Sequence, residues 1–243
     1  MNVESVAFDL DGTLIDSASL VGRILNSMRG EKGLFPLHLD RYRLWSSRGG
    51  AHLVGNALEM PPEDSGALVE EFRGRYYELP TPMDSVFPGA REMLDRLKDA
   101  GYLLAICSNK PQRLCHKVLG ETGLTHFFGA IVGGDTLDRS KPNPAPLNHA
   151  LAHLGGRPET ALMVGDSVVD QQTAAAANVR FAFFTGGYDD GVNGLDAYRV
   201  FDTLDELPSL IEASGNNAGP LSRPSEPHSG RDQCPDDRSK SAC

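Results

Sequence analysis

The chain has 243 residues and a mass of 26.2 kDa, which suits one large domain or one domain that carries an insertion. With 40% hydrophobic and 23% charged residues, its composition excludes a disordered or fibrous protein. The formal net charge is −10, and no basic stripe with interleaved aromatic residues is present. Because that charge would repel a phosphate backbone, we expect no nucleic-acid partner.

The sequence also lacks the usual marks of a membrane or secreted protein. The stretch MNVESVAFDL has no basic residues ahead of a long apolar segment, and no run reaches the roughly 18 apolar residues of a membrane span. Cys107, Cys115, Cys234 and Cys243 show no C-x-x-C spacing and are too few for a secreted disulfide scaffold. We therefore expect a cytoplasmic protein with no membrane contact, reduced thiols and no structural zinc.

The first predicted strand, residues 5–8, is followed by the sequence DLDGT. From about residue 18 to residue 84 the chain shows amphipathic helical patterns, such as SLVGRILNSMRG and EDSGALVEEFRGRYYEL, and no strong strand. The simplest account is a mostly helical insertion after the first strand, with Pro80, Pro82 and Pro88 marking the return to the core.

After the insertion, short apolar runs alternate with helical patterns. We predict strands at residues 102–107, 130–132, 161–164 and 180–184, and helices at residues 90–100 and 111–122 among others, with Pro111 at the favoured first helical position. This alternation is typical of strand-helix units on a parallel sheet. The predicted fold is therefore α/β, with a Rossmann-like, doubly wound parallel sheet and a small helical domain inserted after the first strand.

A composition break after Leu210 divides the last part of the chain from the rest. Residues 214–243 are rich in Ser, Gly, Pro, Asn and charge, and we predict a disordered tail there. Cys234 and Cys243 lie in that tail, so we expect no catalytic role for either. The predicted domains are an α/β core of residues 1–16 and 85–213 and a helical domain of residues 17–84.

Four predicted strands end in polar residues suited to chemistry. These are Asp9 and Asp11 after the first strand, Ser108, Asn109 and Lys110 after the second, Lys141 in a KPNP segment after the third, and Asp166 and Asp170 after the fourth. In an open parallel sheet, ligands bind outside the carboxyl ends of the strands. We therefore expect these groups to face one crevice.

The residue types in that crevice predict phosphoryl transfer with Mg²⁺. Clustered carboxylates repel one another unless a cation neutralises them, and hard oxygen ligands favour Mg²⁺. Asp9 is ionised at neutral pH and can attack without a base, while Asp11 can give and take a proton. Ser108 and the helix start behind it could hold phosphoryl oxygens, and Lys141 could supply positive charge.

Four stretches together resemble the sequence motifs of the haloacid dehalogenase superfamily. They are DLDGT at 9–13, Ser-Asn-Lys at 108–110, Lys141 followed by Pro-Asn-Pro, and GDSVVD at 165–170, and the resemblance spans roughly residues 3–210. It implies that the helical insertion is a cap over the site.

The same resemblance implies a role for each matching residue. Asp9 would be the nucleophile that forms an aspartyl-phosphate, and Asp11 would be the acid/base. Mg²⁺ would be held by the Asp9 carboxylate, the Asp11 main-chain carbonyl and Asp166, with Asp170 supporting the metal or a coordinated water. Ser108 and Asn109 would contact phosphate, and Lys141 would balance charge.

The resemblance extends to the phosphoglycolate phosphatase branch of the superfamily. It is carried by VFPGA at 86–90, GGDTLDRSKPNPAPL at 133–147, VGDSVVDQQTAAAA at 164–177 and TGGYDDG at 185–191, and by a cap loop at 45–53. Two positions depart from that branch: Val169 precedes Asp170, and Arg48 replaces a small polar residue in the cap loop. Arg48 and His52 are candidates for contact with a substrate carboxylate.

The expected activity is Mg²⁺-dependent hydrolysis of a small phosphorylated metabolite, 2-phosphoglycolate above all, by a monomer or homodimer. Another small organic or sugar phosphate is the alternative substrate. Cys107 and Arg113 also have the C-x₅-R spacing of a cysteine phosphatase, although the loop CSNKPQR lacks glycine and Pro111 removes a donor. A non-catalytic binding protein with the same fold is a third alternative.

Overall fold

The computed structural model describes residues 2–215, so the predicted tail lies outside the described residues except for residues 214 and 215, which end a helix. The predicted core boundary at residue 213 therefore falls inside that helix. The strands are β1 (Ser5–Phe8), β2 (Leu103–Cys107), β3 (Ala130–Val132), β4 (Ala161–Gly165), β5 (Arg180–Phe184) and β6 (Arg199–Phe201). The α-helices are α1 (Ala18–Glu31), α2 (Leu39–Ser46), α3 (Gly50–Ala57), α4 (Gly66–Glu78), α5 (Ala90–Asp99), α6 (Gln112–Glu121), α7 (Ala145–Leu154), α8 (Val168–Ala176) and α9 (Leu207–Gly215).

A six-stranded parallel sheet in the order β3-β2-β1-β4-β5-β6 forms the centre of the molecule. The predicted α/β fold with a parallel, doubly wound sheet is thus confirmed, and all five predicted strands are present within a residue of their predicted ends. The sequence prediction missed β6. In the register of the sheet, Phe8 of β1 lies opposite both Ile106 of β2 and Val164 of β4, so the carboxyl ends of these three strands are level.

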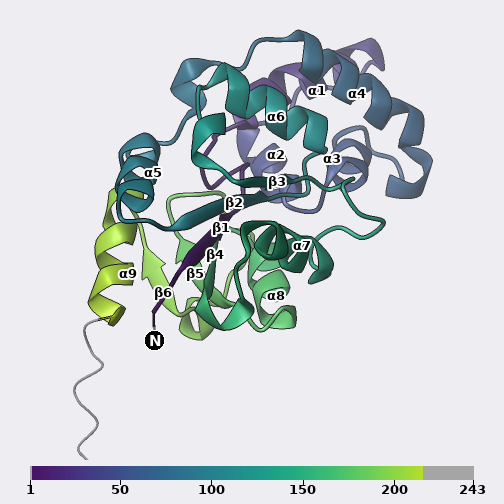
Figure 1. The fold of residues 1–243 in the computed structure, drawn as a ribbon. Helices are drawn as coiled ribbons and strands as arrows, with labels where there is room; N and C mark the ends of the chain where they lie inside the picture. The colour runs from purple at the N-terminus through teal and green to yellow at the C-terminus, as the bar shows by residue number, and fades with distance from the viewer. Residues whose placement is uncertain (1, 216–243) are drawn as a thin grey trace, which may run out of the picture.

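Alternation along the strands builds an apolar core on each face of the sheet. Phe8, Ile106 and Val164 belong to the cluster that contains the buried residues of α5, α6 and α9. Ala7 and Met163 belong to a second cluster, which includes residues of α7 and α8. Helices therefore cover both faces, with α5 and α9 on one side of the sheet and α7 and α8 on the other (Figure 1). Successive side chains of a strand point to opposite faces, which explains the division.

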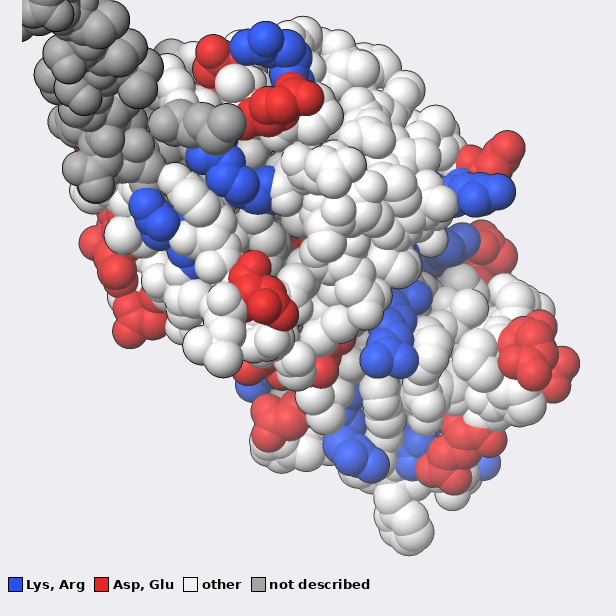
Figure 2. Space-filling model, turned by 90° about the horizontal axis from the view of Figure 1, so that it is seen from below, with Lys and Arg blue, Asp and Glu red and all other residues white. Residues whose placement is uncertain are grey.

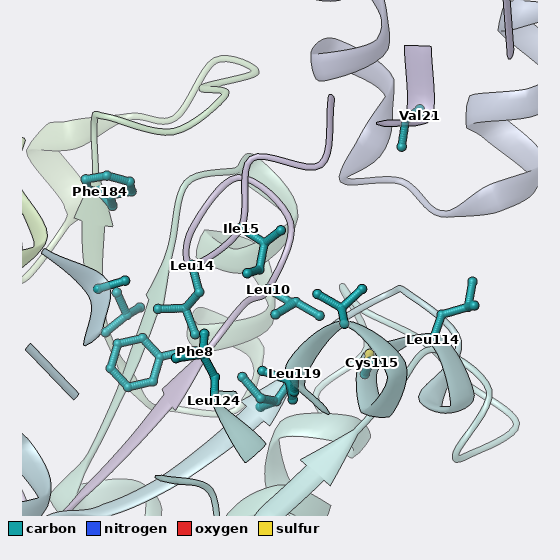
Figure 3. Packing of buried hydrophobic residues seen from close by; sticks show 14 of the residues in the cluster. Phe8, Leu10, Leu14, Ile15, Val21, Leu114, Cys115, Leu119, Leu124 and Phe184 are labelled. Carbon is teal, nitrogen blue, oxygen red and sulfur yellow. The ribbon is translucent and has the colours of Figure 1, made fainter. Parts of the chain in front are cut away.

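Helices α1 to α4 form the helical insertion, residues 18–78, which lies beyond the carboxyl ends of the strands at the top of the view (Figure 1). The segment after β1 connects it to the core through apolar packing. Leu10, Leu14 and Ile15 are fully buried, and they belong to one cluster with Phe8 of the sheet and Val21 of α1 (Figure 3). The insertion and the sheet thus share a continuous core.

Two local predictions need correction. Pro111 is not the first residue of α6; it precedes the helix with an extended backbone, φ −51° and ψ 139°. Residues 45–53, matched to a loop by resemblance, include the end of α2 and the start of α3, with Gly49 between the helices at φ +86°.

Two features of the surface bear on partners. Within residues 2–215, no helix has both the length and the apolar character that crossing a membrane requires. On the face shown in Figure 2, Lys and Arg side chains are interspersed with Asp and Glu rather than gathered into one basic field. This face therefore offers no concentrated positive charge to an anionic partner.

Candidate active site

The ends of neighbouring strands bring three predicted carboxylates together. Asp9 follows β1, and its backbone N–H donates to the carbonyl of Val164 in β4 over 2.9 Å. Asp166 follows β4, and Asp170 lies in the first turn of α8. Asp9, Asp166 and Asp170 are all buried, and each offers one carboxylate oxygen within 4.8 Å of the others.

Lys141 lies between two of these carboxylates. Its Nζ is 2.9 Å from Asp9 Oδ1 and donates to Asp170 Oδ1 over 2.6 Å, and the side chain is only 1% exposed. Burial acts to lower the pKa of Lys141, but Asp170 and Asp9 outweigh it and the pKa is raised. Lys141 therefore remains an ammonium ion, as its predicted charge-balancing role requires.

One ammonium does not balance the whole cluster. Burial raises the pKa of Asp9 to about 6, against the opposing charge of Lys141 and with a further rise from Asp170. Burial, Asp170 and Asp9 likewise raise the pKa of Asp166 well above its usual value. A divalent cation would relieve this concentration of negative charge, and an all-oxygen donor set suits a hard ion. The cluster therefore fits a divalent metal ion.

Asp166 is held in place by groups that the sequence analysis missed. Thr13 Oγ1 donates to Asp166 Oδ1 over 2.7 Å, and the backbone N–H of Tyr188 donates to Oδ2 over 2.8 Å. Two glycines allow this close approach. A Cβ on Gly12 would lie 2.1 Å from Asp166 Oδ2, and one on Gly187 would lie 2.3 Å from the carbonyl oxygen of Gly12.

Asp170 is fixed by a capping box at the start of α8. Its Oδ2 accepts from the hydroxyl of Ser167 over 2.6 Å and from the Ser167 N–H over 3.2 Å, while Oδ1 accepts from Lys141. Asp170 therefore orients Lys141 directly. Whether it also contacts a metal, directly or through water, stays a prediction.

Asp11 has a partner that the sequence analysis did not assign. Lys110 Nζ donates to both of its carboxylate oxygens, over 2.9 and 3.0 Å, and lies 4.3 Å from the ring centroid of Tyr76 in α4. Burial acts to lower the pKa of Lys110, but Asp11 outweighs it and the pKa is raised. Lys110 directly follows the predicted site residues Ser108 and Asn109. Its place in that motif could have predicted that it belongs to the site.

Ser108 and Asn109 follow β2, next to β1. Ser108 is buried, and its Oγ accepts from the Lys110 N–H over 3.3 Å. Asn109 Nδ2 donates over 3.0 Å to the carbonyls of both Ser47 and Lys141. Asn109 therefore joins the helical insertion to the loop that carries Lys141.

The loop after β5 joins the insertion to the same site. Asp190 accepts from the N–H of Val168 at the start of α8 over 2.7 Å and from the hydroxyl of Ser47 over 2.8 Å. Tyr188, whose N–H holds Asp166, donates its hydroxyl to Asp16 just before α1 over 2.9 Å. The loop after β5 therefore contacts both the segments at the insertion and the residues that carry the carboxylate cluster.

A pocket lies between the helical insertion and the core. Its lining includes Asp11, Asn109 and Lys110 from the core and Gly50 and Arg73 from the insertion. The predicted substrate-contact residues lie elsewhere: Arg48 is exposed and does not line this pocket, and the ring of His52 is 2.8 Å from the Asn56 amide nitrogen.

Cys107 is poorly suited to nucleophilic chemistry. The side chain is fully buried at the end of β2, and burial raises the pKa of its thiol to about 12. Arg113 stacks on the ring of Tyr77, 3.9 Å from its centroid. A thiolate is the reactive form of cysteine, so this setting argues against the cysteine-phosphatase alternative.

Comparison with known proteins gives four consistent matches. A family model described as haloacid dehalogenase-like hydrolase matches residues 6–184. A phosphoglycolate phosphatase of Cereibacter sphaeroides (strain ATCC 17025) is 40% identical over 212 residues, covering 85% of this chain and 96% of its own length. Phosphoglycolate phosphatase 1 of Pseudomonas aeruginosa is 38% identical over 192 residues, covering 76% of this chain and 71% of its own. The crystal structure of a predicted phosphoglycolate phosphatase from Haemophilus somnus matches with a TM-score of 0.76 and 26% identity, covering 86% of this chain and 98% of its own.

Proposed function

Because the chain belongs to the haloacid dehalogenase-like hydrolase family and is a phosphoric monoester hydrolase, we propose that it hydrolyses 2-phosphoglycolate to glycolate and phosphate with Mg²⁺. The family resemblance inferred from the four sequence motifs is thereby confirmed. The observation that carries the proposal is the buried group of Asp9, Asp166 and Asp170 around Lys141 at the ends of β1 and β4.

The metal fits the carboxylate cluster. Asp9 and Asp166 would hold the ion through their carboxylates, together with the main-chain carbonyl of Asp11, and Asp170 would support it directly or through water. When bound, Mg²⁺ supplies positive charge that offsets the carboxylates and the substrate phosphate. Thr13 and Tyr188 keep Asp166 oriented for this role through their hydrogen bonds.

The proposed reaction has two displacements at phosphorus. A carboxylate oxygen of Asp9 attacks the phosphorus atom, the bond to the ester oxygen breaks, and Asp11 gives its proton to the departing alkoxide, leaving an aspartyl-phosphate. A water molecule then attacks the same phosphorus atom and gives a proton to Asp11, and the bond to Asp9 breaks. The products are the alcohol and inorganic phosphate, and both carboxyl groups return to their starting state.

Lys110 and Lys141 divide the positive charge between the two aspartates. Lys141 stays beside Asp9, where it offsets charge on the transferred phosphoryl group. Both oxygens of Asp11 accept from Lys110, so proton transfer to the substrate requires this pair to open. At the end of β2, Ser108 would bind phosphoryl oxygens through its hydroxyl. Asn109 would do so through its backbone N–H, since its Nδ2 already donates to two carbonyls.

The helical insertion acts as the cap in this proposal. Its contacts through Ser47 with Asn109 and Asp190 hold it against the core. A closed cap excludes water other than the attacking molecule, which strengthens every charge interaction inside the site. In this proposal the chain divides into the α/β core and a separate helical cap domain.

The substrate assignment is supported by the names of relatives. The chain is 40% and 38% identical to two proteins named as phosphoglycolate phosphatases over most of its length. Another small organic or sugar phosphate is the second candidate, because Arg48 departs from the pattern of that branch in the cap loop.

Initial rates of phosphate release across a panel of monoesters test the proposal. The panel holds 2-phosphoglycolate, ethyl phosphate, glycerol phosphates, sugar phosphates and p-nitrophenyl phosphate, each with Mg²⁺ and with EDTA. We expect the highest kcat/KM for 2-phosphoglycolate, loss of activity in EDTA and recovery with added Mg²⁺. No release from any ester would favour the non-catalytic alternative, and metal-independent turnover would contradict the Mg²⁺ site.

A further inference from the structure

The pocket between the helical insertion and the core is lined by charged groups from both. Asp11, Asn109 and Lys110 line its core side, and Gly50 and Arg73 line its insertion side. A second hollow, which also contains Asp135 and Arg113, shares Arg73 with this pocket. Arg73 therefore lies where the two hollows adjoin, together with Pro111 and Leu114.

Arg73 uses only part of its guanidinium for hydrogen bonds among the described residues. Its Nη1 donates to Glu70 over 2.6 Å, an ion pair with a carboxylate that is 71% exposed. Its Nε is buried, and within the described part of the chain it has no hydrogen-bond partner. A Cβ on Gly50 would lie 3.6 Å from Nη2, so that nitrogen adjoins the first residue of α3. Nε and Nη2 together form the side edge of a guanidinium, which binds carboxylates with two hydrogen bonds.

Asn109 adds an unused acceptor to the same pocket. Its Nδ2 is fixed by two carbonyls, those of Ser47 and Lys141, which also fixes the direction of Oδ1. Asn109 Oδ1 is buried and lacks a partner among the residues that the structure describes. Buried polar atoms are normally paired, and leaving them unpaired costs free energy. An unpaired donor and an unpaired acceptor in one pocket indicate a polar ligand there.

The charges in the pocket indicate the sign of that ligand. Lys110 is already paired with Asp11 inside the pocket, whereas among residues 2–215 Arg73 forms an ion pair only with the exposed Glu70. The first turn of α3 begins at Gly50 beside Arg73 and adds the partial positive charge of a helix start. The insertion side of the pocket is therefore suited to an anion.

We propose that Arg73 is a specificity-determining residue that binds the carboxylate of the substrate through Nε and Nη2. The preferred substrates are then phosphate monoesters of short hydroxy acids, with the phosphate at Asp9 and the carboxylate at Arg73. This inference rests on the proposed phosphatase function. It assigns to a residue of α4 the contact that the sequence analysis expected from Arg48.

A comparison of two substrates that differ only in the carboxylate tests Arg73. Ethyl phosphate replaces the carboxylate of 2-phosphoglycolate by a methyl group. In Arg73→Ala we expect the ratio of kcat/KM for 2-phosphoglycolate to that for ethyl phosphate to fall about 10- to 100-fold, mainly through KM, because one charged bidentate contact is lost. Arg73→Lys should recover part of the ratio, since it keeps the charge but not the two-pronged edge.

Arg75→Ala is the matched control, because Arg75 lies on the same helix and pairs with the exposed residues Glu31 and Glu71. Its ratio should equal that of the wild type. An unchanged ratio in Arg73→Ala would overturn the inference while leaving the phosphatase function intact. A fall in Arg48→Ala but not in Arg73→Ala would also overturn it. A wild-type protein that releases no phosphate from 2-phosphoglycolate would contradict the proposed function, and the inference with it.

Discussion

Gly12 and Asp166 lie so close together that a Cβ atom on Gly12 would stand 2.1 Å from Asp166 Oδ2. Gly12 also has φ +88°, a backbone conformation that favours glycine. The contact joins the turn after β1 to the end of β4, the two neighbouring strands that carry Asp9 and Asp166. The proposed metal site thus depends on the absence of a side chain at residue 12.

Gly12→Ala should therefore remove activity by displacing Asp166. We expect a loss of at least about 100-fold in kcat/KM, the size that a displacement of about 1 Å can cause. Gly101→Ala is the control, because Gly101 has φ +85° and no atom within 4 Å of an added Cβ. Both variants should lose roughly 1–2 kcal/mol of stability from the left-handed backbone. Similar kcat/KM values for the two variants would contradict the claim that close packing of Gly12 against Asp166 causes the loss of activity.

Cys107→Ala should keep most of its activity. The thiol is buried and its pKa is raised to about 12, so it is protonated at neutral pH and takes no part in the proposed reaction. We expect kcat within about threefold of the wild type, with a stability loss of about 1 kcal/mol from the small cavity. Steady-state kinetics and thermal unfolding measure the two effects. A variant that folds normally but no longer turns over would revive the cysteine-phosphatase alternative.

Binding of Mg²⁺ should stabilise the wild-type protein against heat. A free ion at about 100 times its dissociation constant adds about 2.7 kcal/mol, which corresponds to roughly 5–10 °C in Tm for a chain of this size. Asp166→Asn should show little of this shift, because it removes a carboxylate charge from the cluster. Asp99→Asn, at an exposed position in α5, should keep the full shift. Equal shifts in the two variants would place the ion elsewhere.

The stability of the metal-free protein should depend on pH through Asp9. Its pKa rises from 3.8 to about 6 on folding, so its contribution is fully present below 3.8 and is lost as pH rises through about 6. Asp9→Asn cannot ionise and escapes this loss. We compare the free energy of unfolding of Asp9→Asn with that of the wild type. As pH rises from about 5 to about 7.5, the difference should shift by about 1–2 kcal/mol in favour of Asp9→Asn. Urea unfolding of both proteins in EDTA measures this difference. A difference that stays constant with pH would contradict the burial of an uncompensated carboxylate at Asp9.

The strands that position the site could be predicted because they are short, apolar and bounded by polar turns. β6, Arg199 to Phe201, was missed because only its last residue is buried, so it lacks the apolar run that marks the other strands. The order of the strands in the sheet could not be predicted from the alternation of apolar and helical segments. That order makes β1 and β4 neighbours. Helix α2 was not predicted because Tyr42 is its only buried residue, so its sequence shows no apolar stripe.

Within the site, the charged residues could be predicted and their supports could not. Asp9, Lys141 and Asp170 stand out in the sequence because each follows a strand, and the structure brings them together. Thr13 and Tyr188 contact Asp166 through a hydroxyl and a backbone N–H, groups that almost any sequence offers. Their function appears only when segments far apart in the chain meet.

The roles of Asp9 and of its neighbours depend on one chemical claim, that the Asp9 carboxylate attacks phosphorus. Asp9→Asn removes the nucleophile while keeping the size of a side chain that is buried beside Lys141. Its kcat for 2-phosphoglycolate, measured with Mg²⁺ beside Asp99→Asn and with the fold checked by circular dichroism, is the most direct test. We predict a loss of at least about 10⁴-fold in Asp9→Asn and none in Asp99→Asn. A folded Asp9→Asn protein that retains a tenth of the wild-type kcat would contradict the aspartyl-phosphate mechanism.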